Sequence, residues 1–250
     1  MTDAPLCLQA SGLGKTYDGL HALAGIDLNV CEGSRQAILG PNGAGKTTLF
    51  KILAGEIAPT SGAIRFRDRD ITRDPPYRRA AMGISRTFQV TTLFRGMSVL
   101  QNVILAVQGT RRTKYIAWRA VERMPALLDE ARRIVDGVGL ARREEMLVQS
   151  LAYGEQRQLE IGVALACRPR LLLLDEPTAG LARAEVSRIL SLLQALPREI
   201  TILFIEHDMD VAFALAEMVT VLNQGQLVAA GPPDAIRANR LVQDIYLGGL

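Results

Sequence analysis

The sequence predicts an α/β fold into which a separate helical lobe is inserted. Residues 35–39 have the character of a short buried strand, and residues 171–174 form a wholly apolar run. A run that is apolar at every position is typical of a parallel strand covered on both faces. Residues 109–148, in contrast, follow a helical pattern without a strand signal, which indicates the inserted lobe.

The first part of the chain consists of alternating segments. Residues 6–14 and 21–30 alternate between apolar and polar positions around a turn at residues 17–19, so we expect two strands joined by that turn. Residues 62–70 alternate again and suit an exposed strand pair. Pro75-Pro76 then starts a short arginine-rich helix, because proline is favoured at the first helical positions.

The middle of the chain is mainly helical. Residues 84–88 predict a short strand that ends at Gln89. Ser98 can cap a helix that runs to about Val107. The helical pattern of the lobe continues from there to about Val148.

Helices and strands alternate again toward the C-terminus. A helix opens near Ser150 and continues through Cys167. The remaining expected elements are the strand 171–175, the helix 183–196, the strand 200–205, a further helix, a hairpin of residues 219–222 and 226–230, and two short C-terminal helices.

Composition excludes several classes of protein. With 250 residues, of which 48% are apolar, the chain can bury a real core. No apolar run approaches the roughly 18 residues of a membrane span, and the N-terminus lacks the features of a signal peptide, so we expect a cytoplasmic protein. A net charge of +3 gives no indication of nucleic acid as a partner. Three scattered cysteines and two histidines provide no metal-binding spacing.

The strongest motif lies between the strand 35–39 and a helix over 47–53. It has the form G-x-x-x-x-G-K-T, the pattern of a phosphate-binding loop. Glycines allow main-chain N–H groups to close around phosphates, and the helix N-terminus adds partial positive charge. Lys46 is expected to bridge the β- and γ-phosphates and the Thr47 hydroxyl to ligate Mg²⁺. The alternative, a glycine-rich turn with a chance lysine, fits the strand–loop–helix context less well. The expected nucleotide-binding residues are Gly40, Pro41, Asn42, Gly43, Ala44, Gly45, Lys46, Thr47 and Thr48.

Two later strands end in polar side chains. Asp175 and Glu176 follow the run 171–174, and His207 follows the strand 200–205. Because α/β sheets bind ligands at the carboxyl ends of their strands, we expect these groups near the phosphates. Asp175 would then hold Mg²⁺, and Glu176 would orient and polarise the attacking water. A helix-capping acid is the alternative for Glu176, and a purely structural role is the alternative for His207.

The order of these motifs along the sequence resembles that in the ATP-binding subunits of ABC transporters, because six motifs occur in order over nearly the whole chain. They are Tyr17 as the adenine-stacking aromatic, Gly40–Thr48 as Walker A, Gln89 as the Q-loop glutamine, Leu151–Gln156 at the signature, Asp175-Glu176 as Walker B with its catalytic glutamate, and His207 as the switch histidine. On the residues alone, Tyr17 beside its turn is more typical of hairpin packing.

The resemblance implies a P-loop NTPase (RecA-like) core with an antiparallel β subdomain and an inserted α-helical subdomain. The core would comprise residues 1–88 and 157–250, and the helical subdomain about 89–156. Two subunits would dimerise head to tail, each ATP lying between one Walker A loop and the other subunit's signature. The catalytic residues would be Glu176, His207, Gln89 and Lys46; the Mg²⁺ ligands Thr47, Gln89 and Asp175; and the signature contacts Leu151, Ala152, Tyr153, Gly154 and Glu155.

The resemblance also implies partners and a place in the cell. We expect a second ATP-binding subunit, identical or not, two transmembrane permease subunits and, indirectly, a solute-binding protein, but no nucleic acid. The protein would lie peripherally on the cytoplasmic face of the inner membrane.

Two positions depart from the family pattern. The usual signature is Leu-Ser-Gly-Gly-Gln, and Ala152 lacks the hydroxyl that contacts the partner's γ-phosphate, a loss of about 1 kcal/mol. The loop after Walker B ends in Ala182 in place of the usual aspartate, which puts communication across the dimer in doubt.

Other motifs narrow the resemblance to the branched-chain (hydrophobic) amino acid uptake ATPases. They are Leu-Ala-Tyr-Gly-Glu-Gln-Arg at residues 151–157, Arg-Thr-Phe-Gln at 86–89, Ile-Glu-His-Asp-Met at 205–209 and Tyr-Leu-Gly at 246–248. Urea, aromatic-acid and lipopolysaccharide transporters have related subunits and stay as alternatives. A soluble ABC ATPase of DNA repair fits less well, because only about sixty residues separate Gln89 from Leu151, too few for a long coiled coil. A GTPase or small-molecule kinase would leave the signature and Q-loop unexplained.

Overall fold

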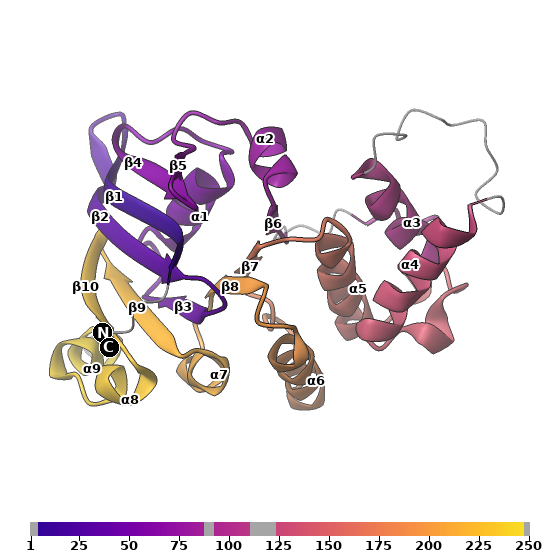
Figure 1. Cartoon of the computed structure of the whole chain (residues 1–250). Helices are drawn as coiled ribbons and strands as arrows, with labels where there is room; N and C mark the ends of the chain where they lie inside the picture. The colour runs from indigo at the N-terminus through magenta and orange to yellow at the C-terminus, as the bar shows by residue number, and fades with distance from the viewer. Residues whose placement is uncertain (1–4, 88–92, 111–123, 248–250) are drawn as a thin grey trace.

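The computed structural model describes residues 5–87, 93–110 and 124–247, which form two sheets and a helical lobe (Figure 1). The strands are β1 Leu6–Tyr17, β2 Leu20–Cys31, β3 Arg35–Leu39, β4 Ser61–Phe66, β5 Arg69–Asp70, β6 Ile84–Arg86, β7 Leu171–Asp175, β8 Thr201–Ile205, β9 Met218–Asn223 and β10 Gln226–Gly231. The helices are α1 Lys46–Ala54, α2 Pro76–Ala81, α3 Val99–Gly109, α4 Pro125–Gly137, α5 Tyr153–Ala166, α6 Arg183–Ala195, α7 Met209–Leu215, α8 Pro233–Arg237 and α9 Arg240–Leu247. None of the helices in these ranges is long and apolar enough to cross a membrane.

The larger sheet places the ends of its central strands at one edge. Its order is β10-β9-β3-β8-β7-β6, and every neighbouring pair except β9–β10 is parallel. Asp175 at the end of β7 pairs in register with Ile205 at the end of β8, and Ile38 of β3 pairs with the same residue. The loops that follow β3, β7 and β8 therefore emerge together.

Successive residues of the buried strands pack into different cores. Leu171 and Leu173 of β7 lie in a core with α1 and the antiparallel sheet β2-β1-β4-β5. Leu172 and Leu174 lie in a second core, formed with α5, α6, α7, α8 and α9 on the opposite face. This alternation confirms that the strand 171–175 is covered on both faces, as its uniformly apolar sequence predicts.

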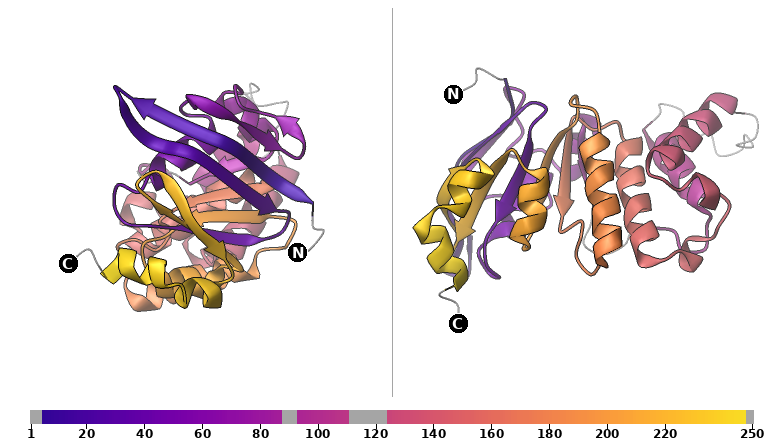
Figure 2. Two further views of the ribbon diagram at one scale, coloured as in Figure 1. Left: turned by 90° about the vertical axis from the view of Figure 1, so that its left-hand side faces the viewer. Right: turned by 90° about the horizontal axis from the view of Figure 1, so that it is seen from below.

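The helical lobe has its own core, formed by α3, α4 and part of α5. Figure 2 shows α3 and α4 at the end of the molecule away from α8 and α9. Leu159 and Ala166 of α5 belong to the core of the lobe, whereas Ile161 of the same helix faces the sheet. Because α5 is shared between the two cores, the boundary between subdomains stays a prediction.

One sequence expectation is wrong. The predicted helix does not continue to Val148, because α4 ends at Gly137 and Gly139 turns the chain with φ 77°. The segment after it contains only two 3₁₀ turns, Ala141–Arg143 and Val148–Ser150. Its carbonyl groups at Glu144 and Met146 accept hydrogen bonds from Leu100 and Val99. They satisfy N–H groups of the first turn of α3 that no helix can satisfy itself.

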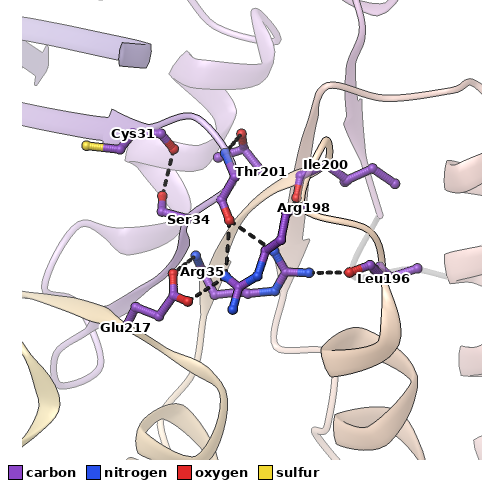
Figure 3. Close-up of polar contacts among 9 residues, drawn as sticks. Cys31, Ser34, Arg35, Leu196, Arg198, Ile200, Thr201 and Glu217 are labelled. Carbon is purple, nitrogen blue, oxygen red and sulfur yellow. Dashed lines mark hydrogen bonds and ion pairs between the residues drawn. The ribbon is translucent and has the colours of Figure 1, made fainter. Parts of the chain in front are cut away.

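The edge of the sheet away from the strand ends is fixed by a buried arginine (Figure 3). Arg35, 2% exposed, donates to the carbonyls of Gly33 at 3.1 Å and Leu196 at 2.6 Å. Glu217 accepts from the Arg35 amide at 3.1 Å and pairs with Arg198. These contacts tie the start of β3 to the loops that precede β8 and β9.

A second buried arginine holds the phosphate-loop helix. Arg79, 1% exposed, makes five hydrogen bonds, all to main-chain carbonyls. It donates to Ile52 and Leu53 at the end of α1 and to Ile71, Thr72 and Asp74 near α2, over 2.7–3.2 Å. Burial lowers the pKa of this guanidinium, and Asp74 opposes that effect.

Replacement of Arg79 should therefore destabilise the fold strongly. Arg79→Met removes the guanidinium donor from five carbonyls, of which those of Ile52 and Ile71 also accept a main-chain hydrogen bond, so the free energy of unfolding should fall by about 3 kcal/mol or more. Urea denaturation followed by circular dichroism measures it. Arg78→Met is the matched control, since Arg78 lies on the same helix but its side chain is 59% exposed. Equal losses in the two variants would contradict this account.

Candidate nucleotide-binding site

The predicted phosphate loop connects β3 to α1 and is pressed against neighbouring backbone. At Gly40 a Cβ atom would lie 2.2 Å from the carbonyl oxygen of Leu222, and at Gly45 it would lie 2.7 Å from that of Ala22. Gly45 also has φ 99°, which strains any other residue. Glycine is therefore required at both positions by close packing as well as by backbone geometry.

Hydrogen bonds fix the loop to two strands from other parts of the chain. The amide of Gly225, in the turn between β9 and β10, donates to the Ala44 carbonyl at 3.1 Å. The Gly225 carbonyl in turn accepts from Ala24 of β2 at 2.8 Å. The β9–β10 turn thus holds the loop directly and connects it to β2 of the other sheet.

Lys46 points into the curve of this loop. Its side chain is buried, and Nζ donates to the carbonyls of Gly40 at 2.5 Å and Pro41 at 3.0 Å. Burial lowers the pKa of Lys46, while the charges of Glu176 and Asp175 oppose that shift. Carbonyl oxygens satisfy the hydrogen bonds of an ammonium group but not its charge, so the loop is suited to an anionic ligand.

A pocket of about 430 Å³ opens over the loop. Residues 42–48 line it, together with Glu176 and the hairpin residues Gln224 and Gly225. Leu20, His21 and Ala22 at the start of β2 complete the wall. Sequence reasoning did not select these three residues, although they follow the turn that carries Tyr17.

Tyr17 is outside the lining of this pocket. Its side chain is 44% exposed, and Lys15 Nζ lies 5.0 Å from the centre of its ring. Its role in stacking on the base stays a prediction. Gln89, expected at the metal and the water, lies outside the described residues.

Asp175 is paired with an arginine that the sequence analysis did not assign to the site. The carboxylate is 2% exposed, and its Oδ2 accepts from Arg86 Nη2 at 2.8 Å. Arg86 also binds Glu56 just beyond α1, over 2.6 Å. The available signal was the position of Arg86 at the end of β6, the parallel neighbour of β7.

Glu176 has an unusual backbone conformation. Its φ is 46°, in the left-handed region, and its amide donates to the Ile205 carbonyl at 3.1 Å. A left-handed non-glycine residue costs of order 1 kcal/mol and is concentrated at functional sites. The turn directs the partly exposed carboxylate into the pocket, where Oε2 lies 4.0 Å from His207 Nδ1.

The signature residues are located at the start of α5 and do not line this chain's own phosphate pocket. Ala152 caps the helix without a side-chain acceptor, while its amide donates to Glu155 Oε2 at 3.0 Å. The ring of Tyr153 packs over Gly180, in the loop after Walker B. The start of α5 is thus joined to the loop that leads to α6.

No described part of the chain contains a cluster of three or more His, Cys, Asp or Glu side chains that could hold a metal ion by itself. Thr47 lines the pocket, and Asp175, buried and paired with Arg86, lies near enough to act on the charge of Lys46. Mg²⁺ commonly takes one or two protein ligands and completes its shell with phosphate oxygens and water, so this donor set fits it.

Comparison with known proteins agrees with the geometry. The family model described as ABC transporter matches residues 23–179. The high-affinity branched-chain amino acid transport ATP-binding protein BraF of Pseudomonas aeruginosa is 38% identical, over 96% of this chain and 97% of its own. This similarity confirms the resemblance to the branched-chain amino acid subfamily.

Solved structures confirm the expected fold class. An ATP-binding cassette of an ABC transporter in its ADP conformation has a TM-score of 0.84 and 26% identity, covering 97% of this chain and 99% of its own. A dimeric bacterial ABC transporter cassette has a TM-score of 0.78 and 25% identity, covering 90% and 98%. The chain belongs to the ABC transporter family, among its ATP-binding proteins.

Proposed function

We propose that this protein hydrolyses ATP to drive an ABC importer for branched-chain amino acids or a related small solute. One observation carries the catalytic part: a single pocket brings Lys46, the buried cation of the phosphate loop, together with the carboxylate of Glu176. The solute is inferred from the names of relatives such as BraF.

Each side chain has a distinct role in this proposal. Lys46 and the loop N–H groups bind the β- and γ-phosphates. Thr47 and Asp175, with Gln89, would hold Mg²⁺, which neutralises phosphate charge when bound. Glu176 accepts a hydrogen bond from the attacking water and orients it toward the γ-phosphate.

A second ATP-binding subunit completes the site. The signature residues of this chain lie outside its own pocket, so they are free to cover the nucleotide of a partner. One of the similar structures is a dimeric cassette. Because Ala152 offers no hydroxyl, we infer that the stronger dimer forms with an unlike subunit that carries serine there.

We infer that the two permease subunits are contacted through the helical lobe, near Phe94. Its side chain is 58% exposed. The backbone beneath it is held by Asn102, whose Oδ1 accepts from the Phe94 amide at 2.8 Å and whose Nδ2 donates to the Phe94 carbonyl at 3.1 Å. An exposed aromatic ring on a backbone that is held in place suits a protein partner. This contact would hold the subunit at the cytoplasmic face of the inner membrane.

Removal of the loop cation tests nucleotide binding. Lys46→Ala should abolish ATP hydrolysis and raise the Kd of ATP about tenfold or more, because a charge-assisted phosphate contact is lost. Phosphate release and fluorescent-nucleotide titration measure the two effects. Lys51→Ala, on the exposed side of α1, should behave as wild type. Normal turnover in Lys46→Ala would refute the site.

Glu176→Gln separates binding from chemistry. The variant keeps size and hydrogen bonding but removes the base, so kcat should fall about 100-fold or more while the Kd of ATP changes little. Bound ATP should then accumulate in dimers, which light scattering detects with and without Mg-ATP, alone and with candidate partner subunits. Glu145→Gln, at an exposed position of the lobe, is the control. A variant that stays monomeric in every mixture would refute the shared site.

Phe94→Asp tests coupling to the membrane subunits. A charge on this exposed ring position should leave basal ATPase activity intact but prevent assembly with the permeases, because a desolvated aromatic contact is replaced by a carboxylate. Co-purification and solute uptake in vesicles report the outcome. Leu241→Asp, 52% exposed on α9, is the matched control. Wild-type uptake by Phe94→Asp would show that the permeases bind elsewhere.

A further inference from the structure

Glu206, immediately before the switch histidine, is fully buried and carries a carboxylate that the proposed mechanism does not use. It follows β8 and is 0% exposed. Its Oε1 accepts two hydrogen bonds from Thr178, from the amide at 3.2 Å and from the hydroxyl at 2.7 Å. One of the two carboxylate oxygens of Glu206 is therefore hydrogen-bonded to the segment that follows Walker B.

The other oxygen, Oε2, has no hydrogen-bond partner among the described residues. It lies 4.0 Å from Nδ1 of His207. Burial raises the pKa of Glu206, whereas the hydrogen bonds from Thr178 and the neighbouring His207 oppose that shift. A buried carboxylate oxygen without a partner is costly, so its position next to an imidazole requires an explanation.

His207 is surrounded by acidic groups from several elements. Glu176 Oε2, after β7, and Glu206 Oε2, after β8, each lie 4.0 Å from Nδ1. Asp208 is the next residue, but its Oδ1 accepts from the amides of Asp210 and Val211 as the cap of α7. The His207 side chain is 57% exposed.

We propose that Glu206 is a positioning residue for His207, and this proposal rests on the proposed ATP hydrolysis and on the catalytic role that the family resemblance implies for His207. A small rotation brings the Nδ1–H group of His207 into hydrogen-bond distance of Glu206 Oε2. The Nε2–H group then points away from the carboxylate and donates to the γ-phosphate. A carboxylate that accepts from one ring nitrogen fixes the orientation of the ring, and a ring protonated on both nitrogens can then donate from the other nitrogen to an anion.

The same carboxylate links His207 to the segment after Walker B. Thr178 holds Oε1, and the chain continues from Thr178 through Gly180 to Ala182. In this proposal the position of the His207 ring therefore depends on that segment as well as on the end of β8.

Two near-isosteric variants distinguish positioning from a purely structural role. Glu206→Gln keeps an oxygen for Thr178 but removes the negative charge beside Nδ1. Thr178→Val removes the Thr178 hydroxyl from Oε1 and leaves the charge in place. If Glu206 serves only to hold Thr178, Glu206→Gln should resemble wild type and Thr178→Val should be the more impaired. The proposal predicts the reverse order.

The first readout is the hydrogen-bonded state of the His207 ring, followed by its ring ¹⁵N signals in NMR spectra of the full nucleotide-free chain, independent of ATPase activity. The sequence has only two histidines, so His207→Ala assigns the signals. Glu206→Gln replaces the carboxylate beside Nδ1 by a neutral amide, so the Nδ1 signal should move from its wild-type position. Thr178→Val should leave that signal near the wild-type position.

The second readout is steady-state hydrolysis of Mg-ATP. Glu206→Gln should lower kcat about tenfold and change the KM for ATP less than about threefold, because the imidazole that contacts the γ-phosphate is held less firmly in place. An unchanged His207 Nδ1 signal, or an unchanged kcat, overturns the proposal. Absence of hydrolysis in the wild-type chain would instead refute the proposed function, which the NMR measurement does not require.

Discussion

The close packing of the phosphate loop against the turn of β9 and β10 is the constraint on which the site depends. No Cβ can be accommodated at Gly40 without a clash with the Leu222 carbonyl, so the loop must follow the end of β3 at van der Waals distance from β9. That contact exists only because β3 and β9 are parallel neighbours in register. The strand order of the sheet therefore determines the shape of the anion site.

The parallel pairing of the strands also brings the polar side chains of the site close together. Asp175, Glu176, Glu206 and His207 come from two strands whose ends are in register, and Arg86 comes from a third. Asp175 is paired with Arg86, and Glu206 accepts from the Thr178 amide, while the interior positions of β7 and β8 are wholly apolar. Polar groups placed one or two residues earlier would lie in the cores on either face, where a carboxylate is costly.

Sequence could predict those features that depend on local pattern. The apolar run of β7, the G-x-x-x-x-G-K-T loop and the carboxylates after the strand are all contiguous, so their identity follows from spacing. Partners that depend on tertiary structure could not be predicted: Arg86 meets Asp175 from 89 residues away, and Arg79 binds the end of α1 across 26 and 27 residues. The prediction of a helix after α4 failed for the same reason, because carbonyls of that segment accept hydrogen bonds from amides at the start of α3.

The two departures from the family pattern are structurally related. Ala152 and Ala182 each cap a helix, α5 and α6, without a side-chain acceptor, and in both cases a glutamate three residues later accepts from the cap amide at 3.0 Å. The two helix starts also meet, because a Cβ at Gly154 would lie 2.5 Å from Glu185 Oε1. A capping glutamate supplies half of a capping box and a negative charge at the positive helix end, which stabilises each helix start although the hydroxyl is missing. Within the chain, the start of the signature helix therefore packs against both the loop after Walker B, at Gly180, and the start of α6, at Glu185.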